Sequence, residues 1–280
     1  MFIGENDIIE KADLSVVVPV YNEERTLEKL IDRLAQVPGL KEIIMVDDCS
    51  VDRSPAIIER LLERYPFARS VRLERNSGKT AAVCRGIAET TGEIVMIQDA
   101  DLEYDPADIP NLVAPIRAGF ADVVYGSRFM VKRAARVVYF YHYLGNKTLT
   151  FFSNLLTNVN LSDLETCYKA FRGDIIRNMR ITSSGFGFEV EVTAKLAKLK
   201  CAMYEVPISY YGRTYEEGKK ITYRDGVAAL YYIVRFNLFS SLKSSFTELP
   251  ERSQRAIHHS GFDIETSSPP KELASEAKHR

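Results

Sequence analysis

The sequence lacks several features that would assign it to a class at once. Its cysteines, Cys49, Cys84, Cys167 and Cys201, are widely separated and include no Cys-x-x-Cys pair. This spacing argues against a zinc site or a disulfide framework and favours buried, reduced thiols. The first residues are acidic and contain no apolar run of the kind found in a signal peptide. We therefore expect a protein of a reducing cytoplasm.

Long apolar runs are also missing, and none approaches the roughly 20 residues needed to span a bilayer. Two stretches come partway. Residues 137–162 contain Lys147 as their only Lys or Arg, and residues 227–242 are interrupted by Arg235 and Asn237. Each stretch is interpreted as a core helix or, alternatively, as an amphipathic segment at a membrane surface, with the core helix preferred.

The charges are balanced, with 37 basic and 38 acidic residues and a formal net charge of −1. Nucleic-acid-binding proteins usually carry a basic excess, so this balance argues against that class. The composition, 46% hydrophobic and 27% charged over 280 residues, is typical of a globular protein with a sizeable core. From about residue 250 it shifts to Ser, Pro, Glu, Lys and His, which predicts a disordered tail.

The first half of the chain alternates between strand and helix signals. Short apolar runs predict strands near 15–20, 42–46, 70–74, 93–98 and 122–125, with helical spacing between them. This alternation predicts an α/β fold with a Rossmann-like, mostly parallel sheet and helices on both faces. The second half is less regular, with strands expected near 167–171 and 202–211 and helices near 187–199 and 223–242.

Polar clusters directly follow strands at 21–23, 47–50 and 99–103. Because ligands bind at the carboxyl ends of parallel strands, these clusters predict one shared site. Asp99 and Asp101 are two residues apart on an extended segment, so their carboxylates share a face and can reach one cation. The pair predicts a divalent-metal site with positions left open for a diphosphate.

Two other ligand motifs are excluded by their spacing. An EF-hand loop beginning at Asp99 would need glycine at its sixth position and a carboxylate at its twelfth, where the chain has Tyr104 and Pro110. Gly78-Lys79-Thr80 matches the end of a phosphate-binding P-loop, but the first glycine of that motif would fall at Leu73.

A set of short motifs in order gives a more specific resemblance. They are PVYNE (19–23), VDDCS (46–50), NSGK (76–79), QDADLE (98–103), GSRF (126–129), CYKAFR (167–172), GFGFEVE (185–191), EVPISY (205–210) and GRTYEEGKKI (212–221). Over roughly residues 13–240 the chain resembles family-two glycosyltransferases of the GT-A fold. Within that family it resembles dolichyl-phosphate mannose synthase and its polyprenyl-phosphate glycosyltransferase relatives.

The resemblance implies a role for each matching position. The residues implied to hold the base and ribose of a nucleotide-sugar donor are Pro19, Tyr21, Glu23, Val46 and Asp48, with Ala100 against the nucleotide. Asp99 and Asp101 match the pair that binds Mg²⁺ or Mn²⁺, and Glu103 stands where the archetype carries glutamine. The positions implied to surround the phosphates, and with Asp101 to be catalytic, are Arg128, Arg213 and Lys219.

The resemblance also implies how the chain is organised. An N-terminal extension (1–12) precedes a nucleotide-sugar-binding half (13–130), an acceptor-side and lid half of the same GT-A domain (131–245) and a tail (246–280). No transmembrane domain is expected. The basic loop at 212–221, which carries Arg213 and Lys219, is interpreted as a lid over the phosphates.

The implied reaction transfers a hexose, with inversion, from a nucleotide sugar such as GDP-mannose or UDP-glucose to a polyprenyl or dolichyl phosphate. That acceptor is already ionised near neutral pH, so no strong base is needed, and His142 is the only histidine outside the tail. Two alternatives stay open. One keeps the donor but uses a saccharide or other soluble acceptor, with Asp163, Glu165 or Glu189 as base; the other is a catalytically silent, nucleotide-sugar-binding scaffold subunit.

A lipid acceptor implies work at a membrane surface. We expect a cytoplasmic protein that is peripheral on the cytoplasmic face of the membrane. It would reach the lipid through its aromatic stretches or through a membrane partner subunit, since Tyr and Phe suit the membrane interface.

Overall fold

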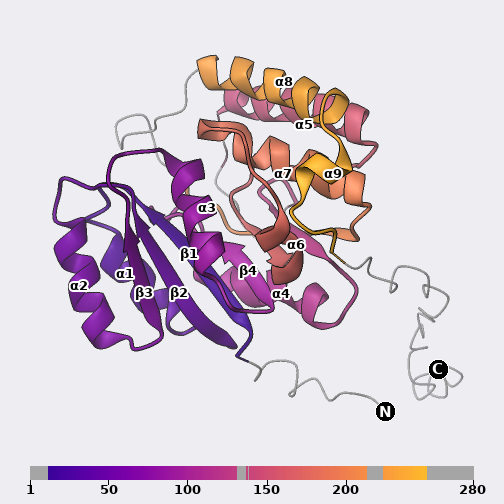
Figure 1. Cartoon of the computed structure of the whole chain (residues 1–280). Helices are drawn as coiled ribbons and strands as arrows, with labels where there is room; N and C mark the ends of the chain where they lie inside the picture. The colour runs from indigo at the N-terminus through magenta and orange to yellow at the C-terminus, as the bar shows by residue number, and fades with distance from the viewer. Residues whose placement is uncertain (1–11, 131–136, 138, 213–222, 251–280) are drawn as a thin grey trace, which may run out of the picture.

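The computed structural model describes residues 12–130, 137, 139–212 and 223–250, which form a sheet flanked by helices (Figure 1). The strands are β1 (Leu14–Val20), β2 (Leu40–Asp47), β3 (Ala68–Arg72), β4 (Ile94–Ile97), β5 (Val123–Ser127), β6 (Lys169–Arg172) and β7 (Met203–Pro207). The helices are α1 (Leu27–Leu34), α2 (Ser54–Arg64), α3 (Lys79–Glu89), α4 (Ile109–Arg117), α5 (Phe140–Thr157), α6 (Gly173–Asn178), α7 (Phe188–Leu199), α8 (Tyr223–Leu238) and α9 (Leu242–Ser245). Short 3₁₀ turns lie at Pro106–Asp108 and Gly185–Gly187.

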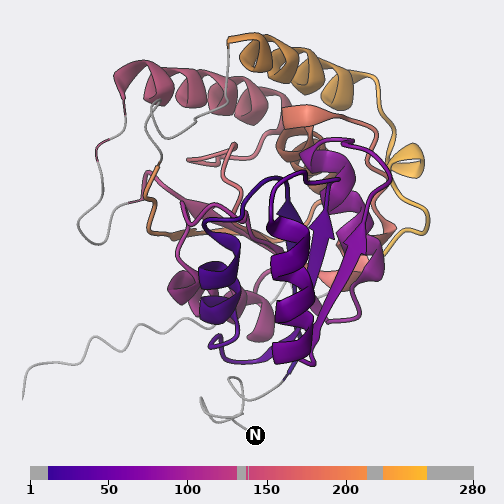
Figure 2. The same cartoon turned by 90° about the vertical axis from the view of Figure 1, so that its left-hand side faces the viewer.

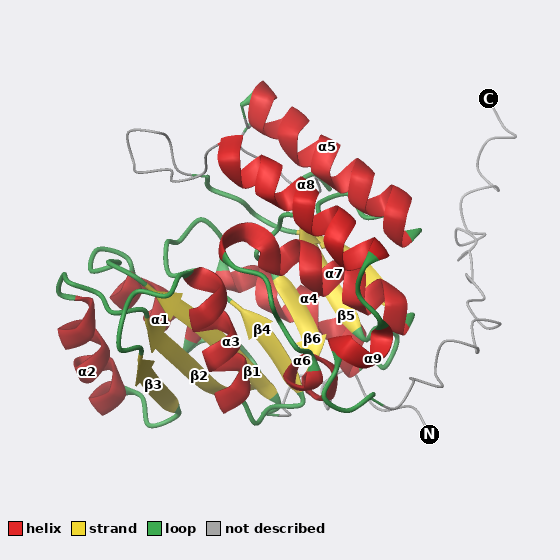
Figure 3. Ribbon diagram, turned by 45° about the horizontal axis from the view of Figure 1, so that its top comes forward, coloured by secondary structure: helices red, strands yellow, loops and turns green. Residues whose placement is uncertain are grey.

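The strands form one sheet in the order β3-β2-β1-β4-β6-β5-β7, and Figure 3 shows the first six side by side. Strand β6 runs antiparallel to both of its neighbours, and every other pairing is parallel. The predicted class, a mostly parallel sheet flanked by helices, is therefore confirmed. The antiparallel insertion of β6 was not predicted, and it places the second half of the chain in the same sheet as the first.

Continuous apolar strands form the core because both faces of the sheet are covered. In β2, Ile43 and Met45 join the main hydrophobic cluster, whereas Ile44 and Val46 pack with Ala82 of α3. In α1, Leu27, Leu30, Ile31 and Leu34 recur at helical spacing, and all four are fully buried. The first half of the chain thus forms a rigid base whose strand ends share one edge.

The preference for a core helix in the first aromatic stretch is wrong. In α5 only Thr150 and Ser153 are buried, while Phe151 and Leu155 are 61% and 64% exposed. The helix packs against α7 and α8 rather than against the sheet, so the rest of the protein covers only a narrow stripe of its surface. Apolar composition alone does not specify which side of such a helix faces inward.

Helix α8 is divided between the core and the surface. Ala229 and Ile233 are buried, whereas Tyr231 and Val234 are 60% and 45% exposed. Helices α5 and α8 lie side by side on the outside of the molecule (Figures 1 and 2). Their exposed apolar side chains, called here the apolar face, are Phe140, Tyr141, Tyr143, Leu144, Phe151, Phe152, Leu155, Leu156, Val227, Leu230, Tyr231, Val234 and Leu238.

Within the described residues, no helix combines the length and hydropathy required to cross a bilayer.

Glycine is required where α3 approaches the sheet. A Cβ atom on Gly86 would lie 2.3 Å from Cγ1 of Val17 and 3.1 Å from Cγ2 of Val46. Gly86→Ala is therefore expected to lower the free energy of unfolding by about 1–3 kcal/mol through overpacking. Urea unfolding measures this change.

The matched control is Gly145→Ala in α5, where an added Cβ meets nothing within 4 Å. It should raise the free energy of unfolding by about 0.5–1 kcal/mol, because alanine is the better helix former. Equal effects of the two substitutions would contradict the close approach of α3.

Candidate active site

The polar loops after β1, β2 and β4 meet at one edge of the sheet, as their positions in the sequence predict. The backbone amide of Asn22 donates to Oγ of Ser50 at 3.0 Å, and Val51 N donates to Oδ1 of Asn22 at 2.9 Å. Strands β1 and β4 are parallel neighbours, so the loop that begins at Gln98 emerges at the same edge. The predicted shared site is thus assembled from three distant segments.

Backbone strain is concentrated in these same loops. Asn22, Cys49 and Leu102 have φ values of 56°, 61° and 61°, in the left-handed region that non-glycine residues rarely adopt. Each residue lies in a different one of the three loops. Strained backbone persists only where the surroundings enforce it, and it is common at ligand sites.

Asp48 links the second loop to the NSGK motif. Its carboxylate accepts hydrogen bonds from the backbone amides of Ser77 at 2.7 Å and Gly78 at 2.8 Å, and the residue is 3% exposed. Gly78 has φ +87°, which glycine adopts without strain, and it directly precedes α3. The NSGK segment therefore positions the first residue of α3, Lys79, over the site.

Lys79 makes an ion pair with the first carboxylate of the acidic motif. Its ammonium lies 2.7 Å from Oδ1 and 2.8 Å from Oδ2 of Asp99, and 3.5 Å from Sγ of Cys167. Burial acts to lower the pKa of Lys79, but the Asp99 carboxylate outweighs it and holds that pKa well above its ordinary value. Lys79 therefore stays charged, and Asp99 is neutralised from within the protein.

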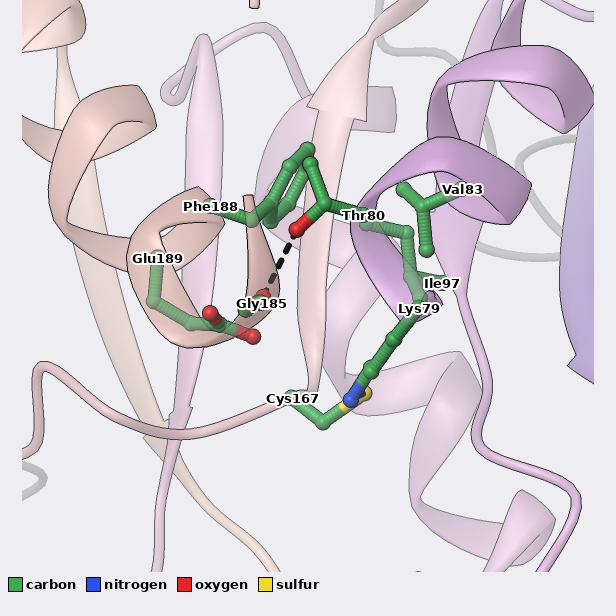
Figure 4. Close-up of a pocket in the computed structure, with 8 residues that line it drawn as sticks. All are labelled: Lys79, Thr80, Val83, Ile97, Cys167, Gly185, Phe188 and Glu189. Atoms are coloured by element: carbon green, nitrogen blue, oxygen red, sulfur yellow. Dashed lines mark hydrogen bonds between the residues drawn. The ribbon is translucent and has the colours of Figure 1, made fainter. Parts of the chain in front are cut away.

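Behind this pair lies a small cavity that is too small for a nucleotide. It is lined by Lys79, Thr80, Val83, Ile97, Cys167, Gly185, Phe188 and Glu189 (Figure 4). Its volume of about 10 Å³ admits at most one water molecule. Thr80 closes it by donating to the carbonyl of Gly185 at 2.7 Å.

The positions expected to hold the donor base and ribose differ in exposure. Tyr21 is 37% exposed at the edge of the site, and the Glu23 carboxylate accepts from Thr26 Oγ1 at 2.8 Å. Val46 and Ala100 are buried, and Val46 packs with Ala82 of α3. Pro19 is partly buried near the end of β1. Their contacts with a nucleotide remain a prediction.

The loop that follows β4, residues 99–103 and called here the acidic loop, offers carboxylate oxygens suited to a hard divalent cation. Oδ1 of Asp101 accepts from the backbone amide of Glu103 at 3.0 Å, and Oε2 of Glu103 accepts from the Tyr210 hydroxyl at 3.1 Å. Within the described residues no cluster of three His, Cys, Asp or Glu side chains could hold a metal. Because Mg²⁺ is commonly bound by one or two carboxylates with phosphate oxygens and water, the residues fit such an ion.

Arg128 is held firmly at the end of β5. Its Nε and one terminal nitrogen each donate to Asp163 at 2.7 Å, and its backbone amide donates to Asp163 Oδ2 at 3.1 Å. Glu205 of β7 fixes the Asp163 segment by accepting from Ser162 N at 2.9 Å and Asp163 N at 3.3 Å. Burial acts to lower the pKa of Arg128, but Asp163 keeps it well above its ordinary value. Asp163 is therefore occupied as a counter-ion.

Glu165, another of the expected bases, lies in a different environment. Burial and the neighbouring Glu189 carboxylate raise the pKa of Glu165 to about 8. Among the described residues, no hydrogen-bond partner reaches its buried Oε1. Nearby Lys169 has its pKa lowered by burial, and its ammonium donates to the carbonyls of Leu164 and Thr166.

Sequence reasoning missed Lys79 and Tyr210 as members of the site. Lys79 was named in the P-loop motif that fails and in the NSGK motif, without a role of its own. Its ion pair with Asp99 is visible only once α3 lies beside the acidic segment. Arg213 and Lys219 lie outside the described residues, so their expected roles remain predictions.

Comparison with known proteins gives matches in both sequence and fold. Residues 15–180 match the glycosyl transferase family 2. The chain is 32% identical to the dodecaprenyl-phosphate galacturonate synthase of Rhizobium johnstonii over 64% of this chain and 53% of that protein. It is 30% identical to the dolichol-phosphate mannosyltransferase of Pyrococcus furiosus over 74% of this chain and 58% of that protein. The chain thus spans about half the length of the curated relatives it matches.

A solved structure with the same fold is glucosyl-3-phosphoglycerate synthase from Mycobacterium tuberculosis in complex with uridine-diphosphate. It superposes with a TM-score of 0.64 at 17% identity, covering 86% of this chain and 87% of that one. At this identity the likeness establishes the fold alone, and the expected GT-A fold is confirmed. Because the family match covers more than half of the residues, the chain belongs to the glycosyl transferase family 2.

Proposed function

We propose that the chain is an inverting glycosyltransferase that moves a hexose from a nucleotide-sugar donor to a polyprenyl phosphate. The relatives named above, which act as synthases or transferases of prenyl or dolichol phosphates, support this assignment. GDP-mannose and UDP-glucose are the donors to test first. The protein would work as a peripheral enzyme on the cytoplasmic face of a membrane, alone or with a membrane partner subunit.

The observation that carries the proposal is the position of Arg128 between the acidic loop and α5. Its guanidinium lies 5.2 Å from the ring centre of Tyr210, which bonds Glu103 in the acidic loop. On its other side it contacts Oδ1 of Asn146 in α5 at 3.5 Å. The cation proposed to bind phosphate therefore lies between the acidic loop and the helix that carries the apolar face.

The protein's part in the reaction is positioning and charge stabilisation. An acceptor phosphate oxygen would form a bond to the anomeric carbon while the bond to the nucleoside diphosphate breaks, and no proton transfer to a base is required. Arg128, with Arg213 and Lys219, would offset the repulsion between the two anionic reactants. A divalent cation on Asp101, with Asp99 and Glu103 contributing, would stabilise the leaving diphosphate when bound.

The apolar face supplies a route to the lipid. Exposed aromatic and aliphatic side chains on α5 and α8 favour burial at the boundary between headgroups and acyl chains. Large exposed apolar patches often mark sites that bind a membrane or another protein.

A hydroxyl acceptor is the second candidate, because Glu165 provides a group able to act as base. Its carboxylate would have to be ionised to accept the proton of a hydroxyl, and its pKa is raised to about 8 by burial and Glu189. Asp163 is disfavoured for this role since Arg128 binds both of its oxygens.

The donor site predicts a metal-dependent ligand response. At nucleotide concentrations about 100-fold above Kd, the preferred one of GDP or UDP with Mn²⁺ should raise Tm by roughly 5–10 °C. Asp101→Asn should abolish the shift, because it removes an anionic metal ligand. Asp105→Asn is the control, since Asp105 lies in the same region but caps the turn at Ala107. No shift with any nucleotide in folded wild-type protein would favour the silent scaffold.

The apolar face predicts membrane binding. Wild-type protein should float with vesicles of anionic phospholipid and polyprenyl phosphate, and the double variant Phe151→Ser/Leu155→Ser should lose most of this binding. Phe120→Ser is the control, because Phe120 is 49% exposed but precedes β5 at the opposite edge of the sheet. Equal flotation of all three proteins would contradict the role of α5.

The two acceptor classes predict different pH profiles. With a phosphate acceptor, whose second pKa is about 6, kcat should level off above about pH 7 and be unchanged in shape by Glu165→Gln. With a hydroxyl acceptor, kcat should rise through about pH 8 as Glu165 loses its proton, and Glu165→Gln should abolish the rise. Initial rates between about pH 5 and about pH 9.5, roughly one unit or more beyond both pKa values, distinguish them.

A further inference from the structure

The segment after β7 is fastened to the acidic loop through its backbone. Ser209 N donates to Oδ2 of Asp108 at 2.6 Å, and Tyr211 N donates to the carbonyl of Glu103 at 2.8 Å. Between them, Tyr210 pairs with Tyr104 in an isolated antiparallel bridge. The end of β7 is therefore joined to the segment 103–108 at three successive residues.

The Tyr210 side chain lies between the acidic carboxylates and Arg128. Its hydroxyl donates to Oε2 of Glu103 at 3.1 Å, and its ring packs on Tyr104 with centres 5.3 Å apart. The Arg128 guanidinium lies 5.2 Å from the same ring centre. A Cβ on Gly212 would lie 2.7 Å from Cε1 of Tyr210, so the glycine leaves room for the ring.

These contacts connect two groups that must act on the same reactants. The backbone amide of Glu103 donates a hydrogen bond to Oδ1 of Asp101. The orientation of Glu103 therefore affects the turn that holds the Asp101 carboxylate. Arg128 is fixed by Asp163 on one side and meets the Tyr210 ring on another. One tyrosine thus contacts both the predicted metal loop and the predicted phosphate-binding cation.

We propose that Tyr210 is a positioning residue that holds the acidic loop and Arg128 at a fixed separation. The proposal rests on the proposed function of this site. The hydroxyl acts on the metal side by orienting Glu103, in the way that outer-shell partners orient metal-binding carboxylates. The ring acts on the phosphate side by supporting the guanidinium through a cation–π contact.

Two substitutions separate these actions. Tyr210→Phe removes the hydroxyl but keeps the ring. It should weaken Mn²⁺ binding about tenfold, and it should raise the acceptor KM less than Tyr210→Leu does, because the hydroxyl also interacts with Arg128. Tyr210→Leu removes both, and it should also raise the KM for polyprenyl phosphate about fivefold. Mn²⁺ binding is followed by the electron paramagnetic resonance of the free ion in the presence of the stabilising nucleoside diphosphate.

The control is Tyr211→Phe, since Tyr211 is 57% exposed and its bond to Glu103 uses only the backbone. In a Glu103→Ala background, Tyr210→Phe should cause no further loss of Mn²⁺ affinity if it acts through Glu103. A merely structural role would lower Tm in Tyr210→Phe without changing Mn²⁺ affinity in the folded protein.

The outcomes separate this proposal from the function on which it rests. If wild-type protein binds Mn²⁺ and the Tyr210→Phe variant binds it equally well or more tightly, the positioning role of Tyr210 is overturned and the proposed function is not. Wild-type protein that binds neither Mn²⁺ nor a nucleoside diphosphate overturns both.

Discussion

Three carboxylates at the carboxyl edge of the sheet, those of Asp48, Asp99 and Asp163, are held by partners from distant segments, and these contacts organise the site. Asp48 accepts hydrogen bonds from backbone amides of the NSGK segment. Asp99 forms an ion pair with Lys79, and Asp163 forms one with Arg128. Asp163 is fully buried beside Arg128, and breaking a buried ion pair by removing one partner typically costs about 3–5 kcal/mol. The pairs are made between segments distant in the sequence, and they set the orientation of the groups available to a ligand.

The antiparallel strand β6 has a large effect on this arrangement. It enters the sheet between β4 and β5, and the segment before it carries Asp163, Glu165 and Cys167 past the ends of both strands. Cys167 thereby reaches Lys79, and Asp163 reaches Arg128. The two halves of the chain meet at this strand, and side-chain contacts connect them directly.

Helix α5 connects the charged site to an apolar surface. Helix α5 contacts Arg128 through Asn146 and exposes apolar side chains on its opposite side. A charged site and an apolar surface thus share one helix, which suits a reactant with an anionic head and a hydrocarbon chain.

The sequence by itself determined the alternating elements, the parallel first half and the acidic loop after β4, because periodicity and strand-end polarity are local properties. It did not determine the strand direction of β6, the exposure of α5 or the partners of Asp99 and Arg128. Lys79 is 20 positions before Asp99 and Asp163 is 35 positions after Arg128, and no local pattern encodes those contacts. Only the tertiary structure decided them, because which charges pair depends on which loops the sheet order brings together.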